Sequence, residues 1–209
     1  LGYSKIDYVV ATHPHADHIG GMAKVLNSFD VGTMYMPEKS HTSKTFENML
    51  VAIENNNIPL IPAKNGVNIL NEGNLKADIL SPVNSSYTDI NEWSAVVKIT
   101  YGETEFLYMG DATTKNENEM ISAGINIDAD VLKVGHHGSD TSSGNEFIKK
   151  VSPKYAVISC GKGNSYGHPS NSALTTLKNN GVNIYRTDES GTIVITADEK
   201  GNITADKKA

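Results

Sequence analysis

The sequence has one cysteine and no long apolar run, and each shortage excludes a class of protein. A single cysteine, Cys160, among 209 residues rules out an internal disulfide framework and a cysteine-rich zinc module. The apolar runs are short, as at 8–11, whereas a transmembrane helix needs about 20 apolar residues. We therefore expect a globular protein with no membrane span in this sequence.

Basic residues are also scarce, because 18 Lys and Arg face 24 Asp and Glu and the net charge is −6. A field of this sign repels a polyanion, so any contact with nucleic acid has to be local. With almost no cysteine to bind metal, the seven histidines become the side chains of interest.

The length fits a single domain spanning residues 1–209, and the hydrophobic pattern predicts mixed strands and helices. Strands at 6–11 and 31–36 are each followed by a helical pattern. Further strands crowd the middle of the chain, after which helices and strands alternate to residue 186 and a hairpin follows at 192–205. Central strands with helices outside predict an α+β fold of two sheets packed face to face and covered by helices.

The strongest motif is Thr-His-Pro-His-Ala-Asp-His at 12–18, directly after the first predicted strand. His13 and His15 flank a proline, so the segment is extended and both imidazoles can project to one side. Asp17 and His18 come next, at the start of a predicted helix, and can face a second point nearby. Such a doubled ligand set predicts two divalent ions about 3.5–4 Å apart.

Two ions of this kind need a ligand that they can share, and a carboxylate is suited to that role. Asp111 comes after a predicted strand, and Gly110 before it would admit close approach of the backbone. We predict that Asp111 bridges the ions. The alternative is that it caps the next helix.

A second histidine pair occurs in Gly-His-His-Gly-Ser at 135–139, again after a predicted strand. Neighbouring residues that leave a strand point to opposite sides, so only one of the two is expected to bind metal. We predict His137 as the ligand and His136 as a neighbour that lines the pocket. The alternative is that His136 is the ligand.

The glycine-rich segment 161–169 carries the last histidine, His168, and the candidate substrate-binding residues Lys162 and Tyr166. His168 either donates a hydrogen bond or a proton to the substrate, or it is an ordinary loop histidine. Lys162 either holds a phosphate or is simply an exposed lysine.

Together these motifs resemble the metallo-β-lactamase superfamily of dinuclear metallohydrolases. The run His-x-His-x-Asp-His-x-Gly-Gly, the later Gly-Asp and a still later histidine carry the resemblance. The segments Lys-Val-Gly-His-His-Gly-Ser and Asn-Ser-Tyr-Gly-His-Pro are similar to one branch of it. That branch comprises the hydrolase domain at the C-terminal end of ComEC competence proteins and related free-standing hydrolases.

The resemblance implies an αββα sandwich with metals at one edge, between the ends of the two sheets. It also implies several strands and an Asp-x-Gly turn before the first histidine motif, which this sequence lacks. We therefore expect an N-terminally incomplete first sheet, completed by upstream sequence or by another chain. The competence proteins of this branch suggest an extracytoplasmic or secreted location, and the alternative is a free-standing soluble hydrolase.

The resemblance also implies a ligand set for each ion. The first set is His13, His15 and Asp111 with solvent, and the second is Asp17, His18, His137 and Asp111. Many superfamily members have a further histidine between the motifs, but the only spare one, His41, is expected in a surface loop. Asn91 and Ser94 stand in a suitable place instead. The imidazoles favour zinc, and the two carboxylates also suit manganese or iron.

Two such ions lower the pKa of bound water to about 7, so the sequence predicts a hydrolase. Asp17 could accept a proton from the nucleophile, while His168 and the Ser139 hydroxyl steady charge on the substrate. We predict a phosphodiesterase or nuclease that acts on a phosphoester, with DNA as one candidate. The alternatives are a lactone or β-lactam hydrolase and a catalytically silent metal-binding domain.

Overall fold

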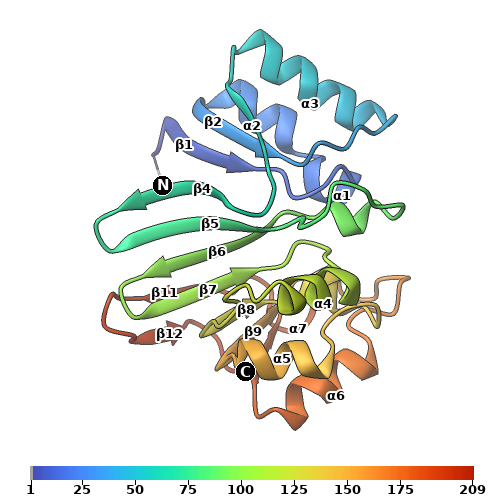
Figure 1. Ribbon diagram of the computed structural model, residues 1–209, viewed down its shortest axis with the longest axis vertical. Helices are drawn as coiled ribbons and strands as arrows, with labels where there is room; N and C mark the ends of the chain where they lie inside the picture. Colours follow the sequence, from blue (N-terminus) through green and yellow to red (C-terminus); the bar gives the residue numbers. More distant parts are fainter. Residues whose placement is uncertain (1) are drawn as a thin grey trace.

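The computed structural model describes residues 2–209 and shows two sheets face to face between outer helices (Figure 1). The elements of the first half, here called the N-terminal layer, are β1 (Lys5–Val10), α1 (Ala16–Ile19), α2 (Met22–Ser28), β2 (Asp30–Met36), α3 (Lys44–Asn55) and β3 (Leu60–Pro62). Its three strands form a parallel sheet in the order β1-β2-β3. The alternation of strand and helix predicted for this part is confirmed.

The second half, the C-terminal layer, contains a seven-stranded sheet in the order β10-β9-β8-β7-β6-β5-β4. Its strands are β4 (Val67–Glu72), β5 (Leu75–Ser81), β6 (Val96–Tyr101), β7 (Thr104–Tyr108), β8 (Val131–Lys133), β9 (Tyr155–Ile158) and β10 (Asn183–Arg186). Strands β4 to β7 pair antiparallel, whereas β7 to β10 pair parallel and need crossover helices. Those helices are α4 (Thr114–Ser122), α5 (Asn145–Val151) and α6 (Asn171–Asn179).

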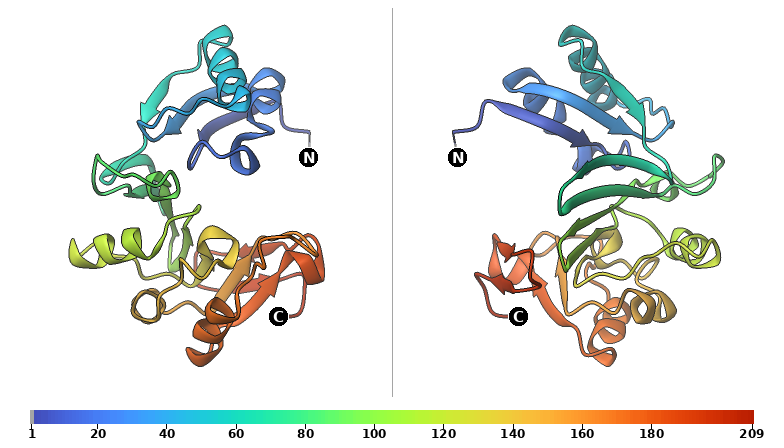
Figure 2. Two further views of the ribbon diagram at one scale, coloured as in Figure 1. Left: turned by 90° about the vertical axis from the view of Figure 1, so that its right-hand side faces the viewer. Right: turned by 60° about the vertical axis from the view of Figure 1, so that its left-hand side comes forward.

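Three apolar clusters hold these layers together. Leu26 and Met49 join α2 and α3 to the first sheet, and Tyr35 of β2 meets Ile79 of β5 between the two sheets. A larger cluster around Leu107 packs the outer helices α4 and α5 against the second sheet. Two further views show the same order of helix, sheet, sheet and helix (Figure 2). The predicted αββα sandwich is confirmed.

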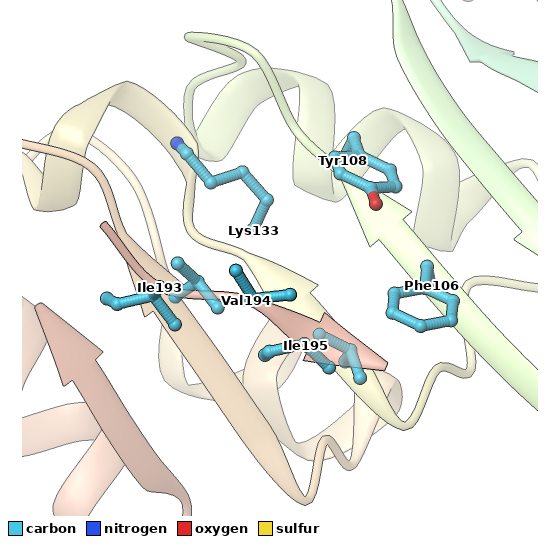
Figure 3. Close-up of a pocket in the computed structure, with 8 residues that line it drawn as sticks. Phe106, Tyr108, Lys133, Ile193, Val194 and Ile195 are labelled. Atoms are coloured by element: carbon cyan, nitrogen blue, oxygen red, sulfur yellow. The ribbon is translucent and has the colours of Figure 1, made fainter. Parts of the chain in front are cut away.

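The three-stranded sheet covers only part of the seven-stranded one. The contacts between the sheets lie on β4, β5 and β6, whereas the face of β7 to β9 that bears Phe106 and Tyr108 borders a cavity of about 320 Å³ (Figure 3). Segment 193–195 lines the other side of this cavity. On its outer edge β1 has no partner strand within residues 2–209. That a further segment completes the first sheet stays a prediction.

The last part of the chain adds small elements at the surface. The predicted closing hairpin is present as β11 (Ile195–Ala197) and β12 (Ile203–Ala205), paired in a separate two-stranded sheet. The short helix α7 (Thr187–Ser190) before it was not expected from the sequence. Throughout residues 2–209, every helix is too short or too polar to cross a bilayer.

Replacing Leu107 by alanine tests the dependence of the fold on its largest cluster. Leu107 is fully buried there, so we expect the free energy of unfolding, measured with urea, to fall by about 3 kcal/mol. Val51→Ala is the control, because Val51 is 47% exposed on α3 and its loss should change stability by no more than about 0.5 kcal/mol. Equal losses in both variants would contradict this assignment of the core.

Candidate metal centre

The first histidine motif leaves β1 as an extended loop before it enters α1. The helix begins only at Ala16, and His15 before it has an extended backbone. The two imidazoles therefore converge, with His13 Nε2 3.1 Å from His15 Nδ1. His13 is fully buried, and this burial lowers its pKa to about 3. The ring is neutral near pH 7 and keeps a lone pair for a metal ion.

Asp17 and His18 lie in the single turn of α1 and face the later Gly-His-His turn. The Nε2 atoms of His18 and His137 are 3.2 Å apart, although 119 positions separate the two residues. Asp17 Oδ2 is also 3.2 Å from His137 Nε2. The other ring nitrogen of His137, Nδ1, lies 2.7 Å from the Ser159 carbonyl oxygen, and this contact fixes the ring with Nε2 toward the cluster.

Asp111 lies between the two histidine groups. Its Oδ2 is 3.6 Å from His13 Nε2, and its Oδ1 is 3.2 Å from His18 Nε2 and 3.5 Å from His137 Nε2. Burial alone would raise the pKa of Asp111, but the neighbouring imidazoles, His18 first, outweigh it and lower the pKa to about 2. The carboxylate is therefore ionised, and its two oxygens face different groups.

The alternative in which Asp111 caps α4 is excluded. Thr113 is the capping residue, and its N–H bonds to Asn116 Oδ1 in a reciprocal capping box. The Asp111 N–H instead donates to Ser94 Oγ at 3.0 Å. Gly110, with φ of +55°, permits this close approach because it has no Cβ. A Cβ at this position would lie only 3.2 Å from the Ser94 Cβ. The glycine before Asp111 thus has the role that the sequence predicted.

These residues form two groups of ligand atoms that share Asp111, and the atoms of each group lie within 4.8 Å of one another. One group is Asp17, His18, Asp111 and His137, and the other is His13, His15 and Asp111. Asp111 Oδ1 is buried without a hydrogen bond of good geometry to any described residue, which is costly unless a cation balances it. The donor set therefore fits divalent ions, and both groups coincide with those that the sequence predicted.

The backbone of the Gly-His-His turn is strained. His136 and His137 adopt left-handed conformations, with φ of +47° and +55°, and each costs about 1–3 kcal/mol for a non-glycine residue. The Ser142 hydroxyl holds the turn by donating to the Gly135 carbonyl at 2.8 Å. The strained turn directs His137 into the ligand group and leaves His136 outside both groups, on the wall of a cavity.

His136 is oriented by a small network within the turn. Its Nδ1 lies 3.0 Å from Thr141 Oγ1, and Ser139 Oγ lies 3.0 Å from the same Thr141 oxygen. Ser139 is only 3% exposed and lines neither cavity beside the ligands. The sequence predicted that the Ser139 hydroxyl contacts the substrate, but in the structure this hydroxyl is buried in the turn and contacts Thr141 instead.

Sequence reasoning missed Glu117 of α4, which supports the far end of this turn. Its carboxylate accepts hydrogen bonds from the Ser143 and Gly144 N–H groups at 2.6 and 2.9 Å. Burial raises the pKa of Glu117 to about 7, and the two amide bonds partly oppose that rise. The sequence shows only a glutamate in the first turn of a polar helix, which is common at exposed helix starts.

Two cavities border the ligand groups. Their volumes are about 280 and 310 Å³, and both are lined by Asp17, His137, Tyr166 and His168. Ser159, Cys160, Gly161 and Asn164 complete the first, and His15, Ala16, Asn91, Asp111 and His136 complete the second. Burial, followed by the neighbouring His136 and His137, lowers the pKa of His168. His168 therefore faces the cavities as a neutral ring.

The remaining candidate residues occupy different places. Ser94 Oγ lies 3.4 Å from His13 Nδ1 and so helps to orient that ligand. Asn91 Oδ1 is buried without a hydrogen-bond partner among the described residues and lines the second cavity. His41 belongs to neither ligand group, and its Nδ1 accepts the Ser43 N–H. Lys162 is exposed and lines neither cavity.

Comparison with known proteins agrees with this geometry. The family model described as the metallo-beta-lactamase superfamily matches residues 2–162. The chain is 34% identical over 192 residues to ComE operon protein 3 of Bacillus subtilis, covering 92% of this chain and 25% of that protein. It is 38% identical over 117 residues to competence protein ComA of Neisseria gonorrhoeae, covering 56% and 17% of the two chains. The chain thus spans about a quarter of these relatives or less.

The fold also occurs in a solved structure with little sequence identity. CmlA, a diiron beta-hydroxylase from Streptomyces venezuelae, superposes with a TM-score of 0.58 at 14% identity, covering 88% of this chain and 44% of CmlA. That likeness concerns the fold alone. The family match, the sandwich and the paired ligand groups lead to one conclusion: this chain belongs to the metallo-β-lactamase superfamily.

Proposed function

We propose that this chain is a phosphodiesterase that acts with two divalent ions, one in each ligand group. The observation that carries the proposal is the pair of ligand groups sharing Asp111, open to cavities lined by Asp17 and His168. Divalent ions in such a site supply a water of lowered pKa and polarise a phosphoryl oxygen. The superfamily is one of metal-dependent hydrolases, and the phosphodiester substrate is our own extension.

Zinc is the ion that the donor atoms favour. Each group contains two imidazoles and one or two carboxylates, and neutral imidazole nitrogens are common zinc ligands. The carboxylates also suit manganese and iron, and CmlA, which shares the fold, is described as a diiron enzyme. We therefore expect direct analysis of the metal content of the native protein to find zinc.

Two residues are positioned to handle protons and charge at the substrate. Asp17 faces His137 Nε2 with one oxygen, while its side chain is 63% exposed, so it can accept a proton from an attacking water. His168 is neutral near pH 7, because burial lowers its pKa, and its ring N–H can donate to a phosphoryl oxygen. Ser139 and Thr141 act indirectly. The Thr141 hydroxyl, held by that of Ser139, orients His136 beside one of these cavities.

The choice of a nucleic acid substrate draws on the relatives. One of them is named competence protein ComA, and the branch resembled in sequence includes the hydrolase domain of a competence protein. The net charge of −6 argues against a long electrostatic groove for the polyanion. We therefore propose that the site holds one phosphodiester at a time, with DNA as the candidate and Lys162 as a flanking phosphate contact. An extracytoplasmic location belongs to the same proposal.

Metal loading provides the first test. Zinc should bind at two ions per chain and raise the midpoint of thermal unfolding, because only the folded chain presents both ligand groups, and EDTA should reverse the shift. Asp111→Asn should lose at least one ion, since it weakens the shared ligand. His41→Ala is the matched control, because His41 lies outside both groups, and it should retain both ions. One ion or none in the wild type, measured by mass spectrometry, would contradict the proposal.

Hydrolysis provides the second test. The zinc- and manganese-loaded proteins should cleave bis-p-nitrophenyl phosphate and single-stranded DNA. His15→Ala should lower both rates at least about a hundredfold, because the ligand group of His13, His15 and Asp111 then lacks one nitrogen. Equal rates for wild type and variant would end the proposal. Turnover of a β-lactam or lactone without phosphodiester cleavage would instead support the carbonyl hydrolase. Stoichiometric metal binding without hydrolysis of any ester would support the silent domain.

A further inference from the structure

Tyr166 is the most conspicuous residue of the site that neither metal binding nor proton transfer explains. Its side chain is 81% exposed, although it borders both cavities beside the ligand groups. Exposed aromatic rings at a binding site are a common source of contact with flat groups. The position of the ring therefore indicates contact with part of a ligand.

The ring of Tyr166 is the outermost of three nearly parallel rings. Its plane is 18° from that of His168, with the ring centroids 5.8 Å apart. His168 in turn is 19° from His137, with centroids 6.5 Å apart. The three rings form a series from solvent to a candidate metal ligand. A flat group lying on Tyr166 would place its attached atoms next to the ligand groups.

The loop that presents Tyr166 is held in one conformation by Asn164. The Asn164 Oδ1 accepts the N–H groups of Tyr166 and His168 at 3.2 and 3.0 Å. Its Nδ2 donates to the Gly161 carbonyl at 2.9 Å. The side-chain amide of Asn164 thus joins the two ends of the segment 161–168 by hydrogen bonds to its backbone. The backbone that carries the aromatic ring is therefore pre-organised, which limits the entropy lost on binding.

Positively charged side chains among residues 2–209 do not line the two cavities of this site. Within the described part of the chain, the residues that line the two cavities include no lysine or arginine, and the net charge of the chain is −6. Nucleic acid that is not held by a basic groove can be held by stacking of bases on aromatic rings. Each cavity lies near the lower end of the usual range for ligand pockets, about 300–1,000 Å³, which suits one nucleotide unit.

We propose that Tyr166 stacks on the nucleobase adjoining the phosphodiester that is cleaved, so that the site selects nucleotides whose base is unpaired. This inference rests on the proposed function and narrows its substrate class to single-stranded nucleic acid. Tyr166 is then a specificity-determining residue, and Asn164 is its positioning residue. A base that is paired within a duplex cannot offer its face to the ring.

Binding without turnover is the direct test. The probe is a fluorescent octathymidylate with phosphorothioate linkages, and its partner is the same chain with abasic residues, each titrated against the zinc-loaded protein by anisotropy. We expect Tyr166→Ala to weaken binding of the octathymidylate about tenfold, within the range for loss of one base–aromatic stack, and to leave binding of the abasic chain unchanged. Tyr166→Phe should retain wild-type affinity because it keeps the ring. Tyr3→Ala, which removes another exposed tyrosine, is the control.

The outcomes separate this inference from the proposed function. Equal affinity of wild type and Tyr166→Ala for the octathymidylate, or an equal loss on the abasic chain, would overturn the stacking role even if the enzyme cleaves DNA. A wild type that binds neither probe would overturn it as well. Base-dependent binding through Tyr166 in a protein that hydrolyses no phosphodiester would support the stacking role and remove the proposed activity.

Discussion

A buried carboxylate between three imidazoles is the constraint on which the rest of the site depends. Asp111 is 2% exposed, and its oxygens lie 3.2 to 3.6 Å from nitrogens of His13, His18 and His137. Isolated in an apolar interior, such a charge would cost several kcal/mol, so it requires a cation or hydrogen-bond donors beside it. The strand β7 delivers Asp111 to this place, and Gly110 permits the close approach of its backbone to Ser94.

The partners of Asp111 come from both layers of the molecule. The N-terminal layer supplies the motif 13–18, whereas the C-terminal layer supplies the turn 135–138 as well as Asp111 itself. The apolar contacts between the sheets, among them Tyr35 against Ile79, therefore set the distance between the two halves of the site. The geometry of the site therefore depends on the packing of the sheets. A shift of about 1 Å between the layers would separate the Nε2 atoms of His18 and His137, which now lie 3.2 Å apart.

The sequence could indicate the candidate ligands because metal sites have a dense local pattern of ligand residue types. Three histidines and an aspartate within positions 13–18 have few structural explanations, and the fold confirms that they lie together with Asp111. The short apolar runs predicted strands of the sandwich for the same reason, since such a run is a local property of the sequence. Features that depend on a short-range pattern could therefore be predicted from the residues alone.

The supporting atoms could not be predicted in this way, because they are defined by contacts between distant segments. The Ser159 carbonyl that fixes His137 is a backbone group, which any residue could provide. Glu117 has the sequence context of an exposed helix start, yet the fold buries it under the turn at 143–144. The position of Ser139 differed from prediction for a related reason, since its exposure depends on the conformation of the strained turn. Backbone strain of this kind cannot be predicted from the residue types.

The acidic charge of the chain and its candidate substrate are compatible only if recognition is local. A protein with net charge −6 gains little from steering a polyanion over its surface. Cations bound by the two ligand groups would reverse the charge at one point, and that point adjoins the exposed ring of Tyr166. Attraction at a single phosphate and stacking at a single base together define a recognition unit of about one nucleotide. Such a unit needs neither a basic groove nor a long contact surface, and its affinity should depend less on salt than that of proteins which neutralise many phosphates.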